Sequence, residues 1–266
     1  MLLFRIPRII WEDILLSSKF IGIYLGILII GLIYNGKFIS HRLDPSIPDM
    51  FSTMFQGAQF LVILVPVYLL LLSLIFPASF NTLRLFRYGS RERFTAYIFV
   101  TIFIITGAFL FIYMLAGFIY GFSLTGTLKN SWTTEIGYPY MILDGQINLE
   151  TFKISNLIST YVITEMLVFI IIGLIAAIIY AILKRYVFSF FIVQGLILLD
   201  FTMEQLFNTS LFVKYAQITL YTWSDIHFGF VIVYFLGIII VLTTILYLVI
   251  NKRDFTLQGD GYDDNH

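Results

Sequence analysis

The chain has 266 residues and no formal net charge, with 16 basic and 16 acidic residues. Hydrophobic residues make up 59% and charged residues 12% of the chain, whereas ordinary globular chains carry about twice that charged fraction. The absence of cysteine excludes disulfides, thiol chemistry and cysteine-ligated metals. This composition indicates a polytopic membrane protein of the cell membrane, and we expect no nucleic-acid partner.

Six nearly uncharged stretches are long enough, or almost long enough, to cross a bilayer as helices, which takes about 20 apolar residues. Water is absent from the bilayer core, so backbone groups must pair within each segment, and helices are therefore expected. The predicted fold is an all-α integral membrane protein with six transmembrane helices. The predicted spans are residues 20–34, 58–78, 96–120, 157–183, 187–207 and 228–250.

The basic residues predict the orientation, because cytoplasmic loops carry the excess of Lys and Arg. With the N-terminus inside, 11 basic residues fall in inner gaps and five in outer gaps. Both termini are therefore predicted to be cytoplasmic. A five-span alternative, with residues 187–207 dipping in and returning, would place Lys252 and Arg253 outside.

Three parts are expected along the chain. Residues 1–18 predict an amphipathic helix lying on the inner leaflet, with a plain lead-in to the first span as the alternative. Residues 19–254 form the transmembrane domain, and residues 255–266, which carry three aspartates and two glycines, predict a disordered tail. The outer gaps, residues 35–57 and 121–156, are rich in turn-forming residues and are expected to be irregular loops.

Motifs for catalysis are missing from the sequence. The pair Gly36-Lys37 is followed by Phe38, so no phosphate-cradling loop for ATP is encoded. His41, His227 and His266 stand apart from each other and from any His-Glu pattern, so we expect no metal site. The chain is predicted to be a non-enzyme with no cofactor of its own.

The inner elbow, residues 84–93, joins the second and third predicted spans. Arg84, Arg87 and Arg91 would share one face of a helix, and Gly89-Ser90 would break that helix or start the next. One interpretation is an anchor on anionic headgroups. The other is a surface helix docked in a partner protein.

The elbow string Phe86-Arg87-Tyr88-Gly89-Ser90-Arg91-Glu92-Arg93-Phe94 resembles that of ABC-2-type permease subunits of bacterial ABC transporters, in the Gram-positive branch that exports peptides and antibiotics. Glu92 departs from the basic residue that is usual there. The resemblance implies a dimer with an identical or similar permease subunit, and a separate ATPase subunit that carries ATP and magnesium. It also implies that the ATPase contact is made by Arg84, Arg87, Tyr88, Gly89, Ser90, Arg91 and Arg93.

Ionisable side chains inside spans are costly and often functional. Glu165 lies about 13 Å from the outer end of the fourth predicted span, at 1.5 Å per residue, and Asp200 and Glu204 share one face of the fifth. We expect that these three, with Gln194, line a translocation pathway in the outer half of the membrane. The alternative is structural: a protonated, hydrogen-bonded Glu165, and an early end of the fifth span at Asp200 and Glu204.

Pro66 lies in the middle of the second predicted span, where its missing N–H should kink the helix. Small residues at four-residue spacing, Gly22 and Gly26 in the first span and Gly173, Ala177 and Ala181 in the fourth, allow close helix approach. They would serve either dimerisation or internal packing.

The leading hypothesis is therefore a permease subunit of an ATP-driven exporter, moving an amphipathic substrate, such as a peptide or antibiotic, out of the cell. The competing class is an ion-coupled secondary transporter or channel with Glu165, Asp200 and Glu204 as titrating groups. A membrane-bound enzyme or an immunity protein is the third class, for which Glu165 offers too few catalytic partners.

Overall fold

The computed structural model describes residues 18–40, 44–57, 59–80, 89–142, 153–216 and 228–252. These ranges contain helices and no strand, which confirms the all-α membrane fold. The elements are α2 (Ser18–Ser40), α3 (Ile47–Met54), the π-helix η1 (Gln59–Leu64), α4 (Val65–Ser79), α6 (Arg91–Thr125), the 3-10 turn η2 (Ser131–Thr133), α7 (Tyr138–Ile142), α8 (Ile154–Leu183), α9 (Tyr186–Phe207), α10 (Val213–Ala216) and α12 (Phe228–Lys252).

Five helical segments in the described ranges are long and apolar enough to cross a membrane. They comprise η1 with α4, and the helices α6, α8, α9 and α12. The apolar part of α2, Tyr24–Lys37, is shorter than a full span. Membrane character is thus confirmed, while the count of six spans and the cytoplasmic termini stay predictions.

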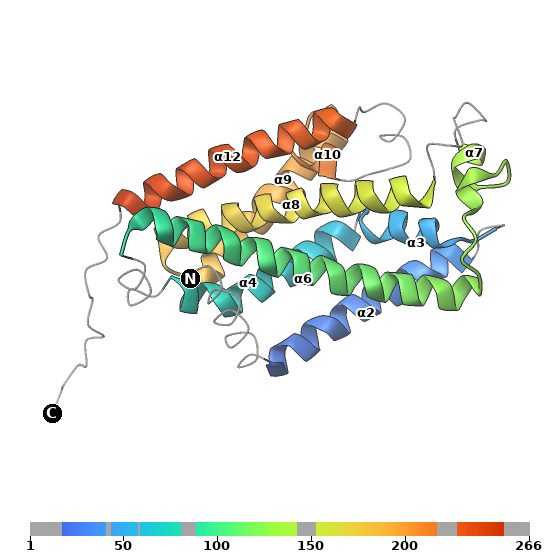
Figure 1. Ribbon diagram of the computed structural model, residues 1–266, viewed down its shortest axis with the longest axis horizontal. Helices are drawn as coiled ribbons and strands as arrows, with labels where there is room; N and C mark the ends of the chain where they lie inside the picture. The colour runs from blue at the N-terminus through green and yellow to red at the C-terminus, as the bar shows by residue number, and fades with distance from the viewer. Residues whose placement is uncertain are drawn as a thin grey trace.

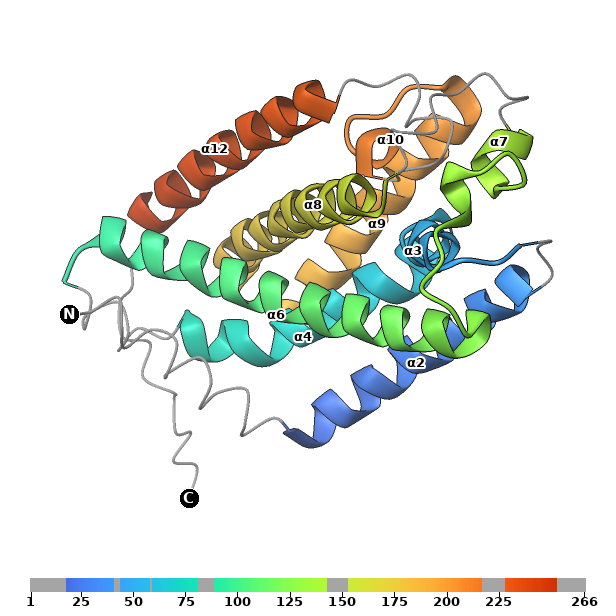
Figure 2. The same cartoon turned by 45° about the vertical axis from the view of Figure 1, so that its right-hand side comes forward.

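The long helices form a bundle whose two ends differ (Figure 1). At one end, on the left of Figure 1, α4 and α8 end and α6 begins, and α12 ends there too. At the other end lie α3 and α7. In the turned view α8 runs through the middle of the bundle, with α6 below it and α12 above it (Figure 2), and α8 packs against both of these helices. The inner elbow and the outer loops are therefore separated by the full length of α6.

The outer gap between α2 and η1 differs from the irregular loop that we expected. It contains α3, seven of whose eight residues are buried. Ser46 precedes this helix in extended conformation, and the Asp49 carboxylate accepts a hydrogen bond from the Ser46 backbone N–H at 2.8 Å. This is half of a capping box, and Pro48 in the first turn favours the same helix start. A local N-terminal signal therefore builds a helix where turn-forming composition predicted a loop.

Close contact between α3 and α6 depends on two glycines one helical turn apart. A Cβ at Gly117 would lie 2.2 Å from Met54 Sδ, and one at Gly121 would lie 3.3 Å from Met50 Cβ. The side chains of α3 therefore occupy the space that side chains on α6 would fill. Gly173 of α8 likewise contacts Ile102 and Tyr68 of the same chain, which favours internal packing for this predicted small-residue face.

Parts of the predicted features lie outside the described residues. These are the expected interfacial helix up to residue 17, the tail, and Arg84, Arg87 and Tyr88 of the inner elbow. The elbow is described from Gly89 onward.

Candidate functional site at the break before the second span

The helical chain is broken between α3 and η1, at residues 55–57, directly before the second crossing, Gln59–Ser79. Gly57 has φ +50°, a left-handed conformation that glycine adopts without strain. Helix ends leave backbone carbonyls without intrahelical partners, and lipid supplies none. A break at this place therefore needs side-chain donors from neighbouring helices.

Two neighbouring helices supply those donors. Asn35 of α2 donates its side-chain amide to the Thr53 carbonyl at 3.4 Å. The Tyr113 hydroxyl of α6 donates to the Met54 carbonyl at 3.3 Å, and it accepts from Gln59 Nε2 at 2.9 Å. The Tyr113 hydroxyl thus joins both sides of the break, the end of α3 and the start of η1.

The π-helical turn beyond the break has a donor from a third helix. In the i to i+5 pattern of a π-helix, residue 66 would donate to the Leu61 carbonyl, but Pro66 has no N–H. Gln194 of α9 donates its Nε2 to that carbonyl at 2.8 Å. The predicted irregularity at Pro66 agrees with this π-helix, and Gln194, expected in a substrate pathway, satisfies the backbone there.

Glu165 of α8 is completely buried, and neither of its carboxyl oxygens has a hydrogen-bond partner among the described residues. Tyr161, one helical turn before it on α8, stacks on Phe55 with the ring centroids 6.0 Å apart, so this face of α8 lies beside the break. Phe55, within the break, contacts the rings of both Tyr113 and Tyr161. The face of α8 that carries Tyr161 and Glu165 therefore packs against aromatic rings at the break.

The two acids of α9 converge on α10. Asp200 accepts hydrogen bonds from the Ser210 hydroxyl and from the backbone N–H groups of residues 211, 212 and 213, at 2.7–2.9 Å. Glu204 Oε1 lies 3.9 Å from the Lys214 ammonium. Asp200 therefore caps the start of α10. Asp200 itself lies in α9, which continues to Phe207. A pathway lined jointly with Glu165 and Gln194 stays a prediction.

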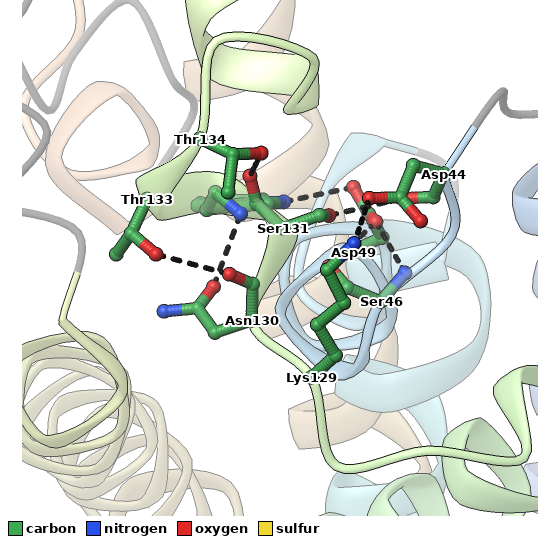
Figure 3. A network of polar contacts seen from close by, with 9 residues as sticks. Asp44, Ser46, Asp49, Lys129, Asn130, Ser131, Thr133 and Thr134 are labelled. Carbon is green, nitrogen blue, oxygen red and sulfur yellow. Dashed lines mark hydrogen bonds and ion pairs between the residues drawn. The ribbon is translucent and has the colours of Figure 1, made fainter.

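A network of polar contacts fixes α3 to the loop after α6 (Figure 3). The buried Asp49 carboxylate accepts from Trp132 Nε1 at 2.9 Å and from the Ser46 hydroxyl at 2.9 Å. Ser131 donates to the Asp44 carbonyl at 3.0 Å. Lys129 pairs with the Asp44 carboxylate at 3.0 Å. We call these six residues the outer network.

At the opposite end, the described part of the inner elbow begins with Gly89 in left-handed conformation, at φ +68°. Ser90 then caps α6 by accepting a hydrogen bond from the Arg93 N–H, which confirms that Gly89-Ser90 starts the next helix. Arg91 donates to the Asn251 side chain at 3.1 Å, so the start of α6 is tied to the end of α12. The side chain of Arg93 is exposed.

Two apolar grooves lie on the bundle surface. One of about 570 Å³ lies between the first half of α6 and α12, with Glu92, Phe99 and Tyr247 among its lining residues. The other, of about 400 Å³, lies between α6 and α8 and includes Phe51 and Met114. The four predicted pathway residues are absent from the lining of both grooves.

The fold and the site define a helical membrane protein in which a short buried helix, α3, precedes the second span, and other helices donate hydrogen bonds to the free carbonyls at the end of α3 and in η1. No family, curated protein or solved structure matches the chain.

Several residues of the site escaped the sequence reasoning, namely Asn35, Asp49, Gln59, Tyr113 and Trp132. A partial signal was present, because the uncharged polar residue Asn35 directly follows the first predicted span, and Gln59 lies two residues after the turn-forming Gly57. Asp49 is the one acid among them, and it lies outside the predicted spans, in the gap 35–57.

Proposed function

We propose that this chain is the permease subunit of an ATP-driven exporter, acting with a second permease subunit and a separate ATPase. The observation that carries the proposal is the continuity of α6. Its 35 residues span about 52 Å at 1.5 Å per residue. The helix starts at the arginine-rich elbow, and the loop that follows it carries Lys129, Ser131 and Trp132 of the outer network.

This connection suits transmission of a rigid-body movement. A partner that displaces the elbow moves the capped first turn of α6, and α12 with it through Arg91 and Asn251. The far end of α6 acts on α3 through Gly117 and Gly121 and through the outer network. ATP binding by a partner would then change the contacts of α3 at the outer face, releasing an amphipathic substrate there.

The test is co-purification of a nucleotide-hydrolysing partner from native membranes. Changing Arg87 and Arg93 to Glu should abolish recovery of the partner and of ATPase activity, because the elbow charges fix its docking. Asn251→Ala removes the internal partner of Arg91 without changing any charge, and it should leave recovery intact. Lys252→Glu reverses one basic charge at the same end of the bundle, and it should also keep the partner.

Equal loss of the partner in Lys252→Glu would show a general charge effect and count against elbow docking. Vesicles containing only this chain that move cargo without nucleotide hydrolysis would overturn the proposal.

A second candidate is ion-coupled transport, favoured by the buried and unpartnered Glu165. Asp200 and Glu204 contribute less to this candidate, because they hold α10. It predicts cargo flux driven by a proton gradient across vesicles without nucleotide, and loss of that flux in Glu165→Gln.

A further inference from the structure

The groove between α6 and α12 lies at the elbow end of the bundle, where α6 begins and α12 ends (Figure 1). Its volume of about 570 Å³ falls within the range of roughly 300–1,000 Å³ that is usual for small-molecule sites. Along α6 the groove runs from Glu92 to Val100, which is about 12 Å at 1.5 Å per residue. One leaflet contributes about half of the roughly 30 Å of hydrocarbon in a bilayer. The groove therefore has nearly the depth of one leaflet.

The walls of this groove are apolar over most of their length. Phe99 of α6 and Ile239 of α12 are among the apolar side chains that line it. The hydroxyls of Thr95 and Thr244 donate to carbonyls four residues earlier in their own helices, and the Thr243 hydroxyl oxygen is buried within the wall. A peptide backbone would find few hydrogen-bonding partners here, whereas a hydrocarbon chain needs none.

The elbow end of the groove carries charges of both signs. Glu92 belongs to the lining and is exposed, and no hydrogen bond or ion pair joins its carboxylate to another described residue. Arg91, next to it in the chain, donates one guanidinium N–H to Asn251 of α12 at 3.1 Å, and a guanidinium has five N–H donors. Arg93 and Lys252 add two exposed positive charges at the same end.

These charges match a phospholipid whose headgroup carries both a phosphate and a primary ammonium. A guanidinium binds phosphate oxygens through charge-assisted hydrogen bonds, and a carboxylate accepts hydrogen bonds from an ammonium in the same way. An anionic headgroup without an ammonium would bring its phosphate beside Glu92 and leave this carboxylate unpaired. A choline headgroup has no N–H to donate to it.

We propose that the groove between α6 and α12 is a binding site for an aminophospholipid of the phosphatidylethanolamine type. The phosphate binds at Arg91, the ammonium binds at Glu92, and one acyl chain lies along the apolar walls. The lipid then bridges the first turn of α6 and the last turns of α12, beside the bond between Arg91 and Asn251. This inference does not depend on an ATPase partner.

Native mass spectrometry of the full chain, delipidated in detergent and titrated with one lipid at a time, tests the site. Wild type should bind one molecule of phosphatidylethanolamine about tenfold more tightly than phosphatidylglycerol or phosphatidylcholine, as expected for one hydrogen bond to a charged group. Equal affinities for the three lipids would show nonspecific lipid contact alone, and tighter binding of phosphatidylglycerol would show a general attraction of anionic lipid. Either result would overturn the proposal.

Two matched pairs of variants locate the bound lipid. Glu92→Gln should lower the affinity for phosphatidylethanolamine about tenfold without weakening that for phosphatidylglycerol, while Glu135→Gln, at an exposed acid of the outer loop, should keep the preference of wild type. Ala96→Phe fills the groove and should abolish the bound lipid, while Leu199→Phe, on the exposed face of α9, should retain it.

A preference that is unchanged in Glu92→Gln would contradict a lipid site of this chemistry. A dimer of the chain that Ala96→Phe separates would assign the groove to a second copy and would also contradict it. Circular dichroism checks that each variant keeps its helix content. If Ala96→Phe does not fold, the lipid preference of wild type and its loss in Glu92→Gln decide the question.

Discussion

Uncharged polar side chains carry out most of the specific bonding inside this bundle. Asn35, Tyr113 and Gln194 come from three different helices, and each donates to a backbone carbonyl of α3 or of the second span. In hydrocarbon these carbonyls have no water as a substitute partner. The irregular backbone of the second span therefore depends on side chains that lie far from it in the sequence.

Replacing Gln194 by Leu should lower the free energy of unfolding by roughly 0.5–2 kcal/mol, the range for a side-chain hydrogen bond within a membrane. The reason is that the Leu61 carbonyl would lose its donor next to Pro66. Unfolding by sodium dodecyl sulfate, followed by circular dichroism, measures the change. Gln205→Leu, on the exposed side of the same helix, should have little effect, and equal losses in the two variants would argue against a specific role of Gln194.

Gly117→Leu should destabilise the bundle by roughly 1–3 kcal/mol through overpacking, since Met54 occupies the space of the added side chain. Gly195→Leu is the matched control, because no atom lies within 4 Å of the position of its Cβ. In detergent-induced unfolding, Gly117→Leu should have a clearly lower free energy of unfolding than Gly195→Leu. An unaffected Gly117→Leu would show that α3 moves away from α6 at little cost.

The short helix α3 is held by its surroundings far more than by its own length. Eight residues are too few for a stable isolated helix. The capping contact from Ser46, the burial against α6 and the Trp132 bond to Asp49 compensate for this. Stability of α3 and order of the loop after α6 should therefore be coupled.

Trp132→Phe tests that coupling. The variant keeps the aromatic ring but removes the Nε1 donor, leaving the buried Asp49 one partner short, at a cost of about 1–3 kcal/mol. Hydrogen exchange should accelerate in α3 as well as around residue 132. Acceleration around residue 132 alone would show that the two segments are independent.

The whole bundle presents one end with the inner elbow and the other with the outer network (Figure 1). The bias of Lys and Arg predicts that the elbow end faces the cytoplasm. This orientation is required by the proposed ATPase contact, which must take place where ATP is available.

Cysteine labelling can test the orientation without background, because the chain has no cysteine. Thr127→Cys and Glu135→Cys, in the exposed outer loop, should react with an impermeant maleimide on intact cells. Arg93→Cys and Lys252→Cys should react only after lysis. The reverse pattern would invert the topology, and labelling of positions 93 and 252 on opposite sides would show that an odd number of spans lies between them.

The positions of the long helices α8 and α9 follow from local chemistry and were predicted closely, whereas the short helix α3 was not predicted. The expected spans 157–183 and 187–207 correspond to α8, Ile154–Leu183, and α9, Tyr186–Phe207, because apolar length and backbone self-pairing are properties of each segment alone. Gly89-Ser90 was also predicted as a possible helix start, and Ser90 caps α6. Such a cap depends only on residues within four positions of each other.

Which helices contact each other is not a local property, and the sequence did not predict these contacts. Glu165, Asp200 and Glu204 look alike as isolated acids in apolar runs, yet Asp200 caps α10, Glu204 faces Lys214, and Glu165 has no partner in the described chain. The bond from Tyr113 to the Met54 carbonyl joins residues 59 positions apart. Such contacts depend on helix rotation and spacing, which are set by packing across the bundle, so the site at the break became visible only once the helices were assembled.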